Sequence, residues 1–406
     1  MEGIVKSKTK FIWLAFILIS FLAFGAVGDQ KAGWKGKIEE EEGVKVIKNP
    51  KDSLYGEIEL ELELDLSIGG DVADERYSFM VITDVEVDDQ GNIYVIDPRQ
   101  YRIQKFDKEG KYLCTIGRKG EGPGEFMRAY RMTLDARAKL YVDDFRKIHI
   151  FSKDNTYEKT INTDYLFRSY LVTKDENFLG WSMIRTEEGS SLDIILVDSN
   201  GNKVNTIASF PDQSVVLTKS ISGGGGISVV GSPPYSPELF FCPWSDELGI
   251  YGYSDKFRLW VVNSSGEVVY IFEKEEKREP TSKREEDEYI KKRIEASKGS
   301  GGIQWSEGDL RKLHKFAKYK PFFTGILTDD EGRIFLTKPK SVLNPEEDTF
   351  YDLFDREGYC LHKIKIHKVN PRVIKNGCIY TVRTDPDTGY YMAERYTIKN
   401  WDQIKK

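Results

Sequence analysis

Residues 82–126 read ITDVEVDDQGNIYVIDPRQYRIQKFDKEGKYLCTIGRKGEGPGEF, a stretch in which apolar and polar residues alternate in four short segments. This alternation is the period of a half-buried β-strand. Acidic turn sequences separate the segments, and Gly91 and Gly110 supply the positive φ that a tight hairpin turn requires. The stretch therefore predicts a four-stranded antiparallel meander, with strands at Thr83–Val87, Asn92–Ile96, Arg102–Phe106 and Tyr112–Ile116.

The same order of strands and turns recurs along the chain. One such sheet cannot bury both of its faces, so a repeated array is expected, with further copies at 131–161, 167–210, 239–272, 322–366 and 371–396. The last copy has three obvious strands, and the alternating segment Gly56–Leu66 has no partner of its own. Pairing that segment as the outer strand of the sixth sheet closes a ring and removes exposed edges. The sequence thus predicts an all-β six-bladed β-propeller over residues 55–400.

Two parts of the first repeat carry a family resemblance. Gly91–Val95, with Arg102–Asp107 and Gly110, resembles an NHL repeat, and the segment 120–126 resembles the inter-blade turn of bacterial NHL-type six-bladed propellers. The close match covers blades one and two. The resemblance implies the propeller fold, but it implies no single function, because such propellers serve as binding platforms, lactonases and lyases.

The N-terminus has the order of an export signal. Lys6, Lys8 and Lys10 precede the apolar run Phe11–Val27, which ends in small residues, so residues 1–28 are expected to be a signal peptide. An uncleaved membrane anchor is the alternative, because the run is near the lower length limit of a membrane span. Residues 29–54 are charged and are expected to form a tether with little order. The protein is expected to be exported, to the periplasm or the cell exterior, and to meet the membrane only through this segment.

Two insertions interrupt the regular spacing. The first, 211–238, contains four consecutive glycines and is expected to be a mobile loop. The second, 274–320, lies between blades four and five and is expected to hold two helices, opened by capping boxes at Ser282/Glu285 and Ser306/Asp309. Both insertions follow an outer strand, so they share one face with the loops that join second and third strands. Long insertions on one face usually mark the binding side.

The loops on that face carry one cation for each blade. A ring of cations around the channel mouth would favour an anionic or carboxylate-bearing ligand. The alternative is that these are ordinary solvated loop ends. The residues expected to bind ligand are Arg99, Arg146, Arg185, Lys338 and Arg383, and Lys256 is the cation of the fourth blade.

Residues suited to catalysis are dispersed. Of the four histidines, His149 lies in mid-strand, His314 on the inserted helix, and His362 and His367 at opposite ends of one outer strand. The acidic turns lack the spacing of a calcium loop and are expected to be turn formers. No metal site, catalytic residue or cofactor is therefore expected, although an active site assembled from several blades would leave weak sequence traces. The four cysteines lie in separate blades and are expected to be free thiols.

Three functions stay open at this point. The first is an exported, non-catalytic binding or scaffold propeller that holds a protein, a peptide or an anionic glycan on its elaborated face. The second is a calcium-dependent lactonase or lyase that uses carboxylates of the channel. The third is a structural part of an envelope assembly, joined through the helical insertion. Nucleic acid is not an expected partner, because the net charge is −6.

Overall fold

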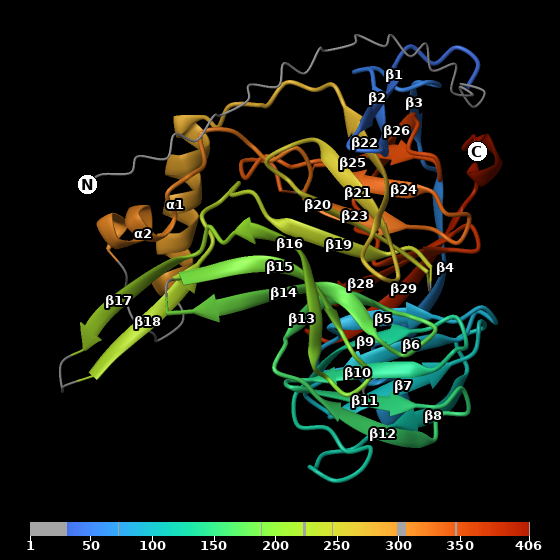
Figure 1. Cartoon of the computed structure of the whole chain (residues 1–406). Coiled ribbons are helices and arrows are strands. Elements are labelled where there is room, and N and C mark those ends of the chain that lie inside the picture. Colours follow the sequence, from blue (N-terminus) through green and yellow to red (C-terminus); the bar gives the residue numbers. More distant parts are fainter. Residues whose placement is uncertain are drawn as a thin grey trace, which may run out of the picture. The chain divides into compact units, whose positions relative to one another are not determined.

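The computed structural model describes residues 31–405 except 72, 188, 222–224, 246, 299–305 and 346. Each predicted repeat forms an antiparallel sheet whose strands follow one another in chain order (Figure 1). Blade one is β5 to β8 (Asp84–Val87, Ile93–Asp97, Arg102–Phe106, Tyr112–Ile116), blade two is β9 to β12 (Ala129–Leu134, Leu140–Asp144, Lys147–Phe151, Tyr157–Asn162), and blade three is β13 to β16 (Phe167–Val172, Phe178–Thr186, Gly189–Val197, Lys203–Pro211).

The second half of the chain builds three more blades. The inner strand of the sixth, β27, lies against the inner strand of the first, β5, so the blades close into a ring. Blade four is β19 to β22 (Leu239–Pro243, Leu248–Tyr253, Arg258–Asn263, Val268–Lys274), blade five is β23 to β26 (Gly325–Thr328, Ile334–Thr337, Thr349–Phe354, Cys360–Ile366), and blade six contains β27 to β29 (Val373–Lys375, Cys378–Thr384, Tyr391–Ile398).

The segment before blade one runs along the outer strands of the last three blades, and we call residues 37–69 the N-terminal belt. Strands β1 (Lys37–Glu41) and β2 (Val44–Asn49) form a hairpin, and β2 pairs in parallel with β22 of blade four. Strand β3 (Glu57–Glu59) pairs in parallel with β26 of blade five. Strand β4 (Leu62–Gly69) pairs antiparallel with β29 and completes blade six.

The belt corrects two expectations from the sequence. The single strand expected at Gly56–Leu66 is divided between blades five and six, because the chain crosses from one blade to the next at Leu60 and Glu61. The tether expected over 29–54 is wrong for residues 37–49, which are paired in a sheet. The charges that suggested a tether form ion pairs, among them Lys48 with Glu39 at 2.5 Å and Arg258 with Glu41 at 2.6 Å.

Asn49 joins the belt to two blades. Its side-chain nitrogen donates to the carbonyl oxygens of Glu273 (3.0 Å) and Gly358 (2.7 Å). Its Oδ1 accepts a hydrogen bond from the backbone nitrogen of Cys360 at 2.8 Å. Because the side chain is only 3% exposed, these bonds hold the outer edges of blades four and five together away from water.

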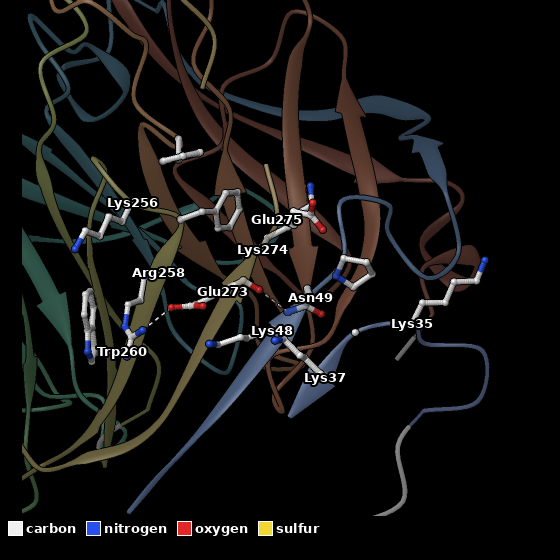
Figure 2. Close-up of a pocket in the computed structure, with 14 residues that line it drawn as sticks. Lys35, Lys37, Lys48, Asn49, Lys256, Arg258, Trp260, Glu273, Lys274 and Glu275 are labelled. Atoms are coloured by element: carbon white, nitrogen blue, oxygen red, sulfur yellow. Dashed lines mark hydrogen bonds and ion pairs between the residues drawn. The ribbon is translucent and has the colours of Figure 1, made fainter. Parts of the chain in front are cut away.

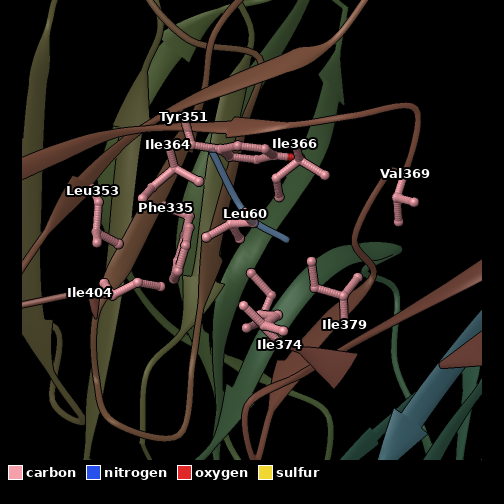
Figure 3. Close-up of a cluster of buried hydrophobic side chains, with 11 residues drawn as sticks. Leu60, Phe335, Tyr351, Leu353, Ile364, Ile366, Val369, Ile374, Ile379 and Ile404 are labelled. Carbon is pink, nitrogen blue, oxygen red and sulfur yellow. The ribbon is translucent and has the colours of Figure 1, made fainter. Parts of the chain in front are cut away.

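Leu60 fills the space between blades five and six. It is 3% exposed and lies among Phe335, Leu353 and Ile364 of blade five and Ile374 of blade six, as Figure 3 shows. Burial of a leucine of this kind stabilises a fold by about 2 kcal/mol. The crossover of the belt is therefore also part of the core.

The two insertions have regular structure. Residues expected to be a mobile loop contain a two-stranded sheet, β17 (Val215–Ile221) with β18 (Gly225–Gly231). Helices α1 (Lys283–Lys298) and α2 (Glu307–Leu313) lie between β22 and β23, and both predicted capping boxes are present. Short 3-10 helices occupy Glu75–Tyr77 and Trp401–Gln403.

None of the helices within the described ranges is long and apolar enough to cross a membrane. The expected signal peptide, residues 1–28, lies outside the described residues. The cysteines Cys114, Cys242, Cys360 and Cys378 are unpaired and belong to blades one, four, five and six.

Candidate functional site

Two buried carboxylates hold equivalent loops of blades one and two. Asp97 ends the second strand of blade one, and its Oδ2 accepts a hydrogen bond from the backbone nitrogen of Met80 at 2.8 Å. Asp144 ends the second strand of blade two, and its oxygens accept from the backbone nitrogens of Met127 (2.7 Å) and Arg128 (2.5 Å). These bonds fix the chain just before the inner strand, so Met80 and Met127 occupy matching positions in neighbouring blades.

The two carboxylates titrate differently although their positions match. Burial raises the pKa of Asp97, against the opposing effect of backbone amides that include Met80. Burial also acts on Asp144, but hydrogen bonds from His149 and from the amides of Met127 and Arg128 outweigh it, and the pKa lies below the ordinary value. Asp144 is therefore ionised at neutral pH and is fully engaged by neighbouring donors.

The turns between second and third strands carry an aromatic ring in each of these blades, which is partly buried at Tyr101 and exposed at Phe145. Tyr101 has a φ of 56° and Phe145 a φ of 59°. This left-handed conformation costs a non-glycine residue about 1–2 kcal/mol, and a bulky residue in it is uncommon. Phe145 is nevertheless 49% exposed, so neither core packing nor backbone preference accounts for the ring.

The methionines and rings line an open groove of about 560 Å³ that we call the Met–Arg groove. Met80 is 48% exposed and Met127 is 44% exposed, although such side chains are ordinarily buried. Flexible thioether side chains adapt to the shape of an apolar partner. The residues that line the groove are Met80, Pro98, Arg99, Tyr101, Met127, Arg128, Tyr130 and Phe145.

The cations of the groove have few anionic neighbours. Arg99 and Arg128 are exposed, and neither forms an ion pair with any residue in the described ranges. Arg146, which lines the adjoining hollow, has one ion pair, with Asp164 at 3.3 Å. The groove is thus apolar at its base and positive at its rim, in a protein whose net charge is −6.

The structure brings together two of the five cations expected to bind ligand. Arg99 and Arg146 line adjoining hollows that share Met127, Arg128 and Phe145. Lys338 instead pairs with Glu276 at 2.5 Å, and Arg383 pairs with the buried Glu394 at 2.6 Å. Arg185 is exposed at the end of the long strand β14, where its charge acts on Asp212.

Comparisons with known proteins agree on the architecture. Residues 73–247 match the model of a family described as a 6-bladed beta-propeller (DUF5128). The chain is a six-bladed β-propeller. The match names the fold and not the NHL repeat type, which stays an interpretation of blades one and two. No curated protein matches the chain at a significant level.

A solved structure shows the same fold. A protein from Bacteroides fragilis that is assigned as exported aligns with a TM-score of 0.51 at 12% identity, over 87% of this chain and 99% of that chain. A member of the DUF4221 family from Bacteroides vulgatus aligns with a TM-score of 0.49 at 11% identity, over 84% of this chain and 98% of that chain. At these identities the likeness concerns the fold, and no activity follows from it.

The propeller has a larger cavity at the rim of blade four. It has a volume of about 790 Å³ and is lined by the N-terminal belt and by strands of blade four. Figure 2 shows Lys48 and Asn49 of the belt beside Arg258 and Glu273 of blade four. Its cations are largely neutralised, because Arg258 pairs with Glu273 at 2.5 Å and Lys274 pairs with Asp352 at 2.6 Å. The cavity therefore favours an anionic ligand less than the Met–Arg groove does, because most of its cations are already paired.

Acidic turn residues line the central channel. Its cavity of about 390 Å³ is lined by residues of all six blades, including several acidic turn residues. Asp88 and Asp329 accept backbone hydrogen bonds of their own turns, from Asn92 at 2.9 Å and from Arg333 at 2.8 Å. Across the described ranges, no three His, Cys, Asp or Glu side chains are grouped so that they could hold a metal ion.

Blade two contains a buried Thr–His–Asp arrangement. His149 Nδ1 lies 2.9 Å from Thr160 Oγ1, and its Nε2 lies 3.4 Å from Asp144. In blade one, Gln104 occupies the matching place and contacts Thr115 at 2.5 Å. The two blades therefore use different side chains at the same buried position between their third and fourth strands.

Sequence reasoning missed Met80, Met127, Arg128 and Phe145. In the sequence, Met80 and Met127 cannot be told from core methionines, because both stand just before a strand with alternating apolar residues. The available signal was the pair Asp97 and Asp144, two carboxylates at matching strand ends. Alignment of blades one and two as repeats would have placed Met80 and Met127 at the same position, next to these carboxylates.

Proposed function

We propose that the chain is an exported, non-catalytic binding propeller whose Met–Arg groove holds an extended polypeptide segment. The observation that carries the proposal is the exposure of Met80, Met127 and Phe145 beside arginines that lack ion-pair partners in the described ranges. Contiguous exposed apolar surface rimmed by polar residues is typical of a protein-binding site. Methionine, aromatic residues and arginine are the residues enriched at such sites.

The chemistry of the groove favours a polypeptide over a sugar. Sugar hydroxyls need hydrogen-bond acceptors as well as donors. The arginines only donate, and the two nearby carboxylates, Asp97 and Asp144, already accept backbone hydrogen bonds. An apolar side chain of a peptide would fit the thioether surface, and Arg99 and Arg146 are proposed to contact its polar or acidic groups.

The groove can be tested with short random peptides displayed on phage. Peptides enriched by the full-length mature protein should bind a Met80→Ser/Met127→Ser variant at least about tenfold more weakly, because two apolar contacts of about 1 kcal/mol each are lost. The matched control is Leu113→Ser, which changes a residue of similar exposure (46%) on the outer strand of blade one. Equal affinity of wild type and the methionine variant for the enriched peptides would contradict the proposal.

Export is proposed from the basic, apolar and small-residue order of residues 1–28. Protein isolated from the native envelope should have its N-terminus close to Asp29. Sequencing of that N-terminus checks this, and a mature chain that retains Phe11–Val27 would support a membrane anchor instead.

A further inference from the structure

A second hollow continues the Met–Arg groove, and we call it the Phe145 hollow. Its volume is about 260 Å³, and it shares Met127, Arg128 and Phe145 with the groove. It adds two further cations, Arg146 and Lys147. The hollow is also lined by three carboxylates, Glu121, Glu125 and Asp144. A ligand that lies in the groove can therefore extend into a recess lined by charges of both signs, and the free cations depend on which carboxylates are already engaged.

Two arginines converge on the ring of Phe145. The guanidinium carbon of Arg128 lies 5.6 Å from the ring centroid, and that of Arg146 lies 5.9 Å from it. Each contact with the ring is favourable by about 0.5–1 kcal/mol. Both groups are positively charged, so an anion that contacts both would be attracted by each of them.

Two of the three carboxylates that line the hollow are already engaged by neighbouring donors. Asp144 accepts the backbone hydrogen bonds of Met127 and Arg128. Glu125 accepts from the backbone of Gly122 and from Arg118, both at 2.9 Å, and these bonds hold the pKa of Glu125 below its usual value. Glu121 is the remaining lining carboxylate. Asp164 pairs with Arg146 at 3.3 Å, but its side chain is 86% exposed. This ion pair therefore contributes little to stability, and a ligand carboxylate can replace Asp164.

The backbone at Phe145 supports a role for the ring itself. A glycine or asparagine would adopt its φ of 59° with less strain. Strained residues persist where the surrounding structure holds them, and they cluster at ligand sites. Phe145 presents a flat apolar surface that both guanidinium groups contact, at 5.6 and 5.9 Å from the ring centroid.

We propose that Arg128 and Arg146 form a carboxylate subsite over Phe145, which binds one acidic group of the polypeptide held in the Met–Arg groove. The inference rests on the proposed function. Guanidinium groups can each bind a carboxylate through two parallel hydrogen bonds. The carboxylate can belong to an aspartate or glutamate side chain, or to the C-terminus of the peptide.

The test uses three synthetic peptides and the full-length mature protein. The first peptide alternates Leu or Phe with Glu and has both ends blocked. The second has Gln in place of every Glu, and the third is the Gln peptide with a free C-terminal carboxylate. Affinities are measured by calorimetry for wild type, for Arg128→Gln/Arg146→Gln and for Arg137→Gln. Arg137 is a matched control, because it is half exposed and pairs with Asp135 at a turn on the opposite face.

Wild type should bind the Glu peptide, or the Gln peptide with a free carboxylate, at least about tenfold more tightly than the blocked Gln peptide. That preference should disappear in the double variant and persist in Arg137→Gln. Which of the two acidic peptides is preferred identifies the source of the carboxylate. Lysine at both positions should restore only part of the preference, because lysine cannot grip a carboxylate in a bidentate manner.

Failure of the inference differs from failure of the proposed function. Equal affinity of wild type for all three peptides, with binding still lost in Met80→Ser/Met127→Ser, would overturn the carboxylate subsite and leave the groove standing. A preference that survives in Arg128→Gln/Arg146→Gln would overturn it as well. Absence of binding by every peptide, together with no enrichment of displayed peptides, would overturn both.

Discussion

Asp143 is a carboxyl group in an unusual environment beside the channel. It lies directly opposite Arg131 on the neighbouring strand and is 4% exposed. Burial raises its pKa to about 8, although Arg131 and the Tyr170 hydroxyl act in the opposite direction. Asp143 is therefore largely protonated at neutral pH in the folded protein, whereas in the unfolded chain it titrates near 4.

The raised pKa makes stability depend on pH in a defined direction. Between about pH 4 and 8 the folded state retains a proton that the unfolded state has released, so this residue's contribution falls as pH rises. Asp143→Asn mimics the protonated form. It should increase the free energy of unfolding by only about 1 kcal/mol at pH 5 and by a few kcal/mol, as an order of magnitude, at pH 9.

Urea unfolding at both pH values measures this difference. Asp154→Asn, which changes an exposed turn residue, is the control and should have no effect at either pH. Strong destabilisation by Asp143→Asn at pH 5 would show instead that Asp143 is ionised and paired with Arg131 under those conditions.

At the scale of the sheet, the hairpin β1–β2 extends blade four and contacts blade five. It covers the outer edge of blade four, buries Val46 and Ile47 completely, and places Asn49 between blades four and five. A tether would do none of this. The hairpin is therefore expected to stabilise blades four and five, although it precedes blade one in the sequence.

Removal of residues 35–48 should lower the thermal midpoint by several degrees, because apolar surface is lost and the edge of β22 becomes exposed. Binding of peptides to the Met–Arg groove should be unaffected, since that groove belongs to blades one and two. Asn49→Ala alone should lose about 2–3 kcal/mol, because three buried hydrogen bonds disappear. Calorimetric melting of both variants checks this, and an unchanged midpoint would restore the tether interpretation.

Local patterns predicted most elements of the fold. Alternation and turn glycines predicted the six repeats, and the capping boxes at Ser282 and Ser306 predicted both helices. The same kind of evidence failed for the hairpin. Its charged residues are satisfied by partners such as Arg258, more than two hundred positions away, and composition alone does not reveal such pairing.

The candidate site was predicted only in part, for a similar reason. The face and the residues Arg99 and Arg146 followed from the positions of loops in a propeller. Whether a cation is available depends on its partner in space. Lys338 is engaged by Glu276 of the helical insertion, and Arg383 by Glu394 of the adjacent strand. Neither pairing changes the sequence pattern at the loop itself.

At the scale of the whole molecule, the ring is closed by a strand from the other end of the chain. Strand β4 pairs with β29 from Leu62 to Gly69, and Leu60 fills the core beside it. Strand β3 pairs with blade five at the same time. Closure of this kind removes exposed edges and couples the stability of all blades.

Deletion of residues 57–69 should therefore abolish cooperative unfolding, in contrast to the milder effect expected for 35–48. The edge of β29 would be exposed, and blades one and six would lose the apolar contacts that join them. Circular dichroism melting and size-exclusion chromatography check this. A deletion variant that remains monomeric and melts within a few degrees of wild type would contradict the role of β4 in closure.

The N-terminal belt also constrains the order of events during synthesis. Residues 37–69 leave the ribosome or the export channel before any blade, yet their partners β22, β26 and β29 belong to blades four, five and six. Blades one to three can form while the strands of the belt still lack their partners. Until residue 398 has emerged, the nascent chain carries unpaired strands, and such edges are prone to aggregation. The protein thus completes its fold only when nearly the whole chain is available, and that interval is where a chaperone would have the most to protect.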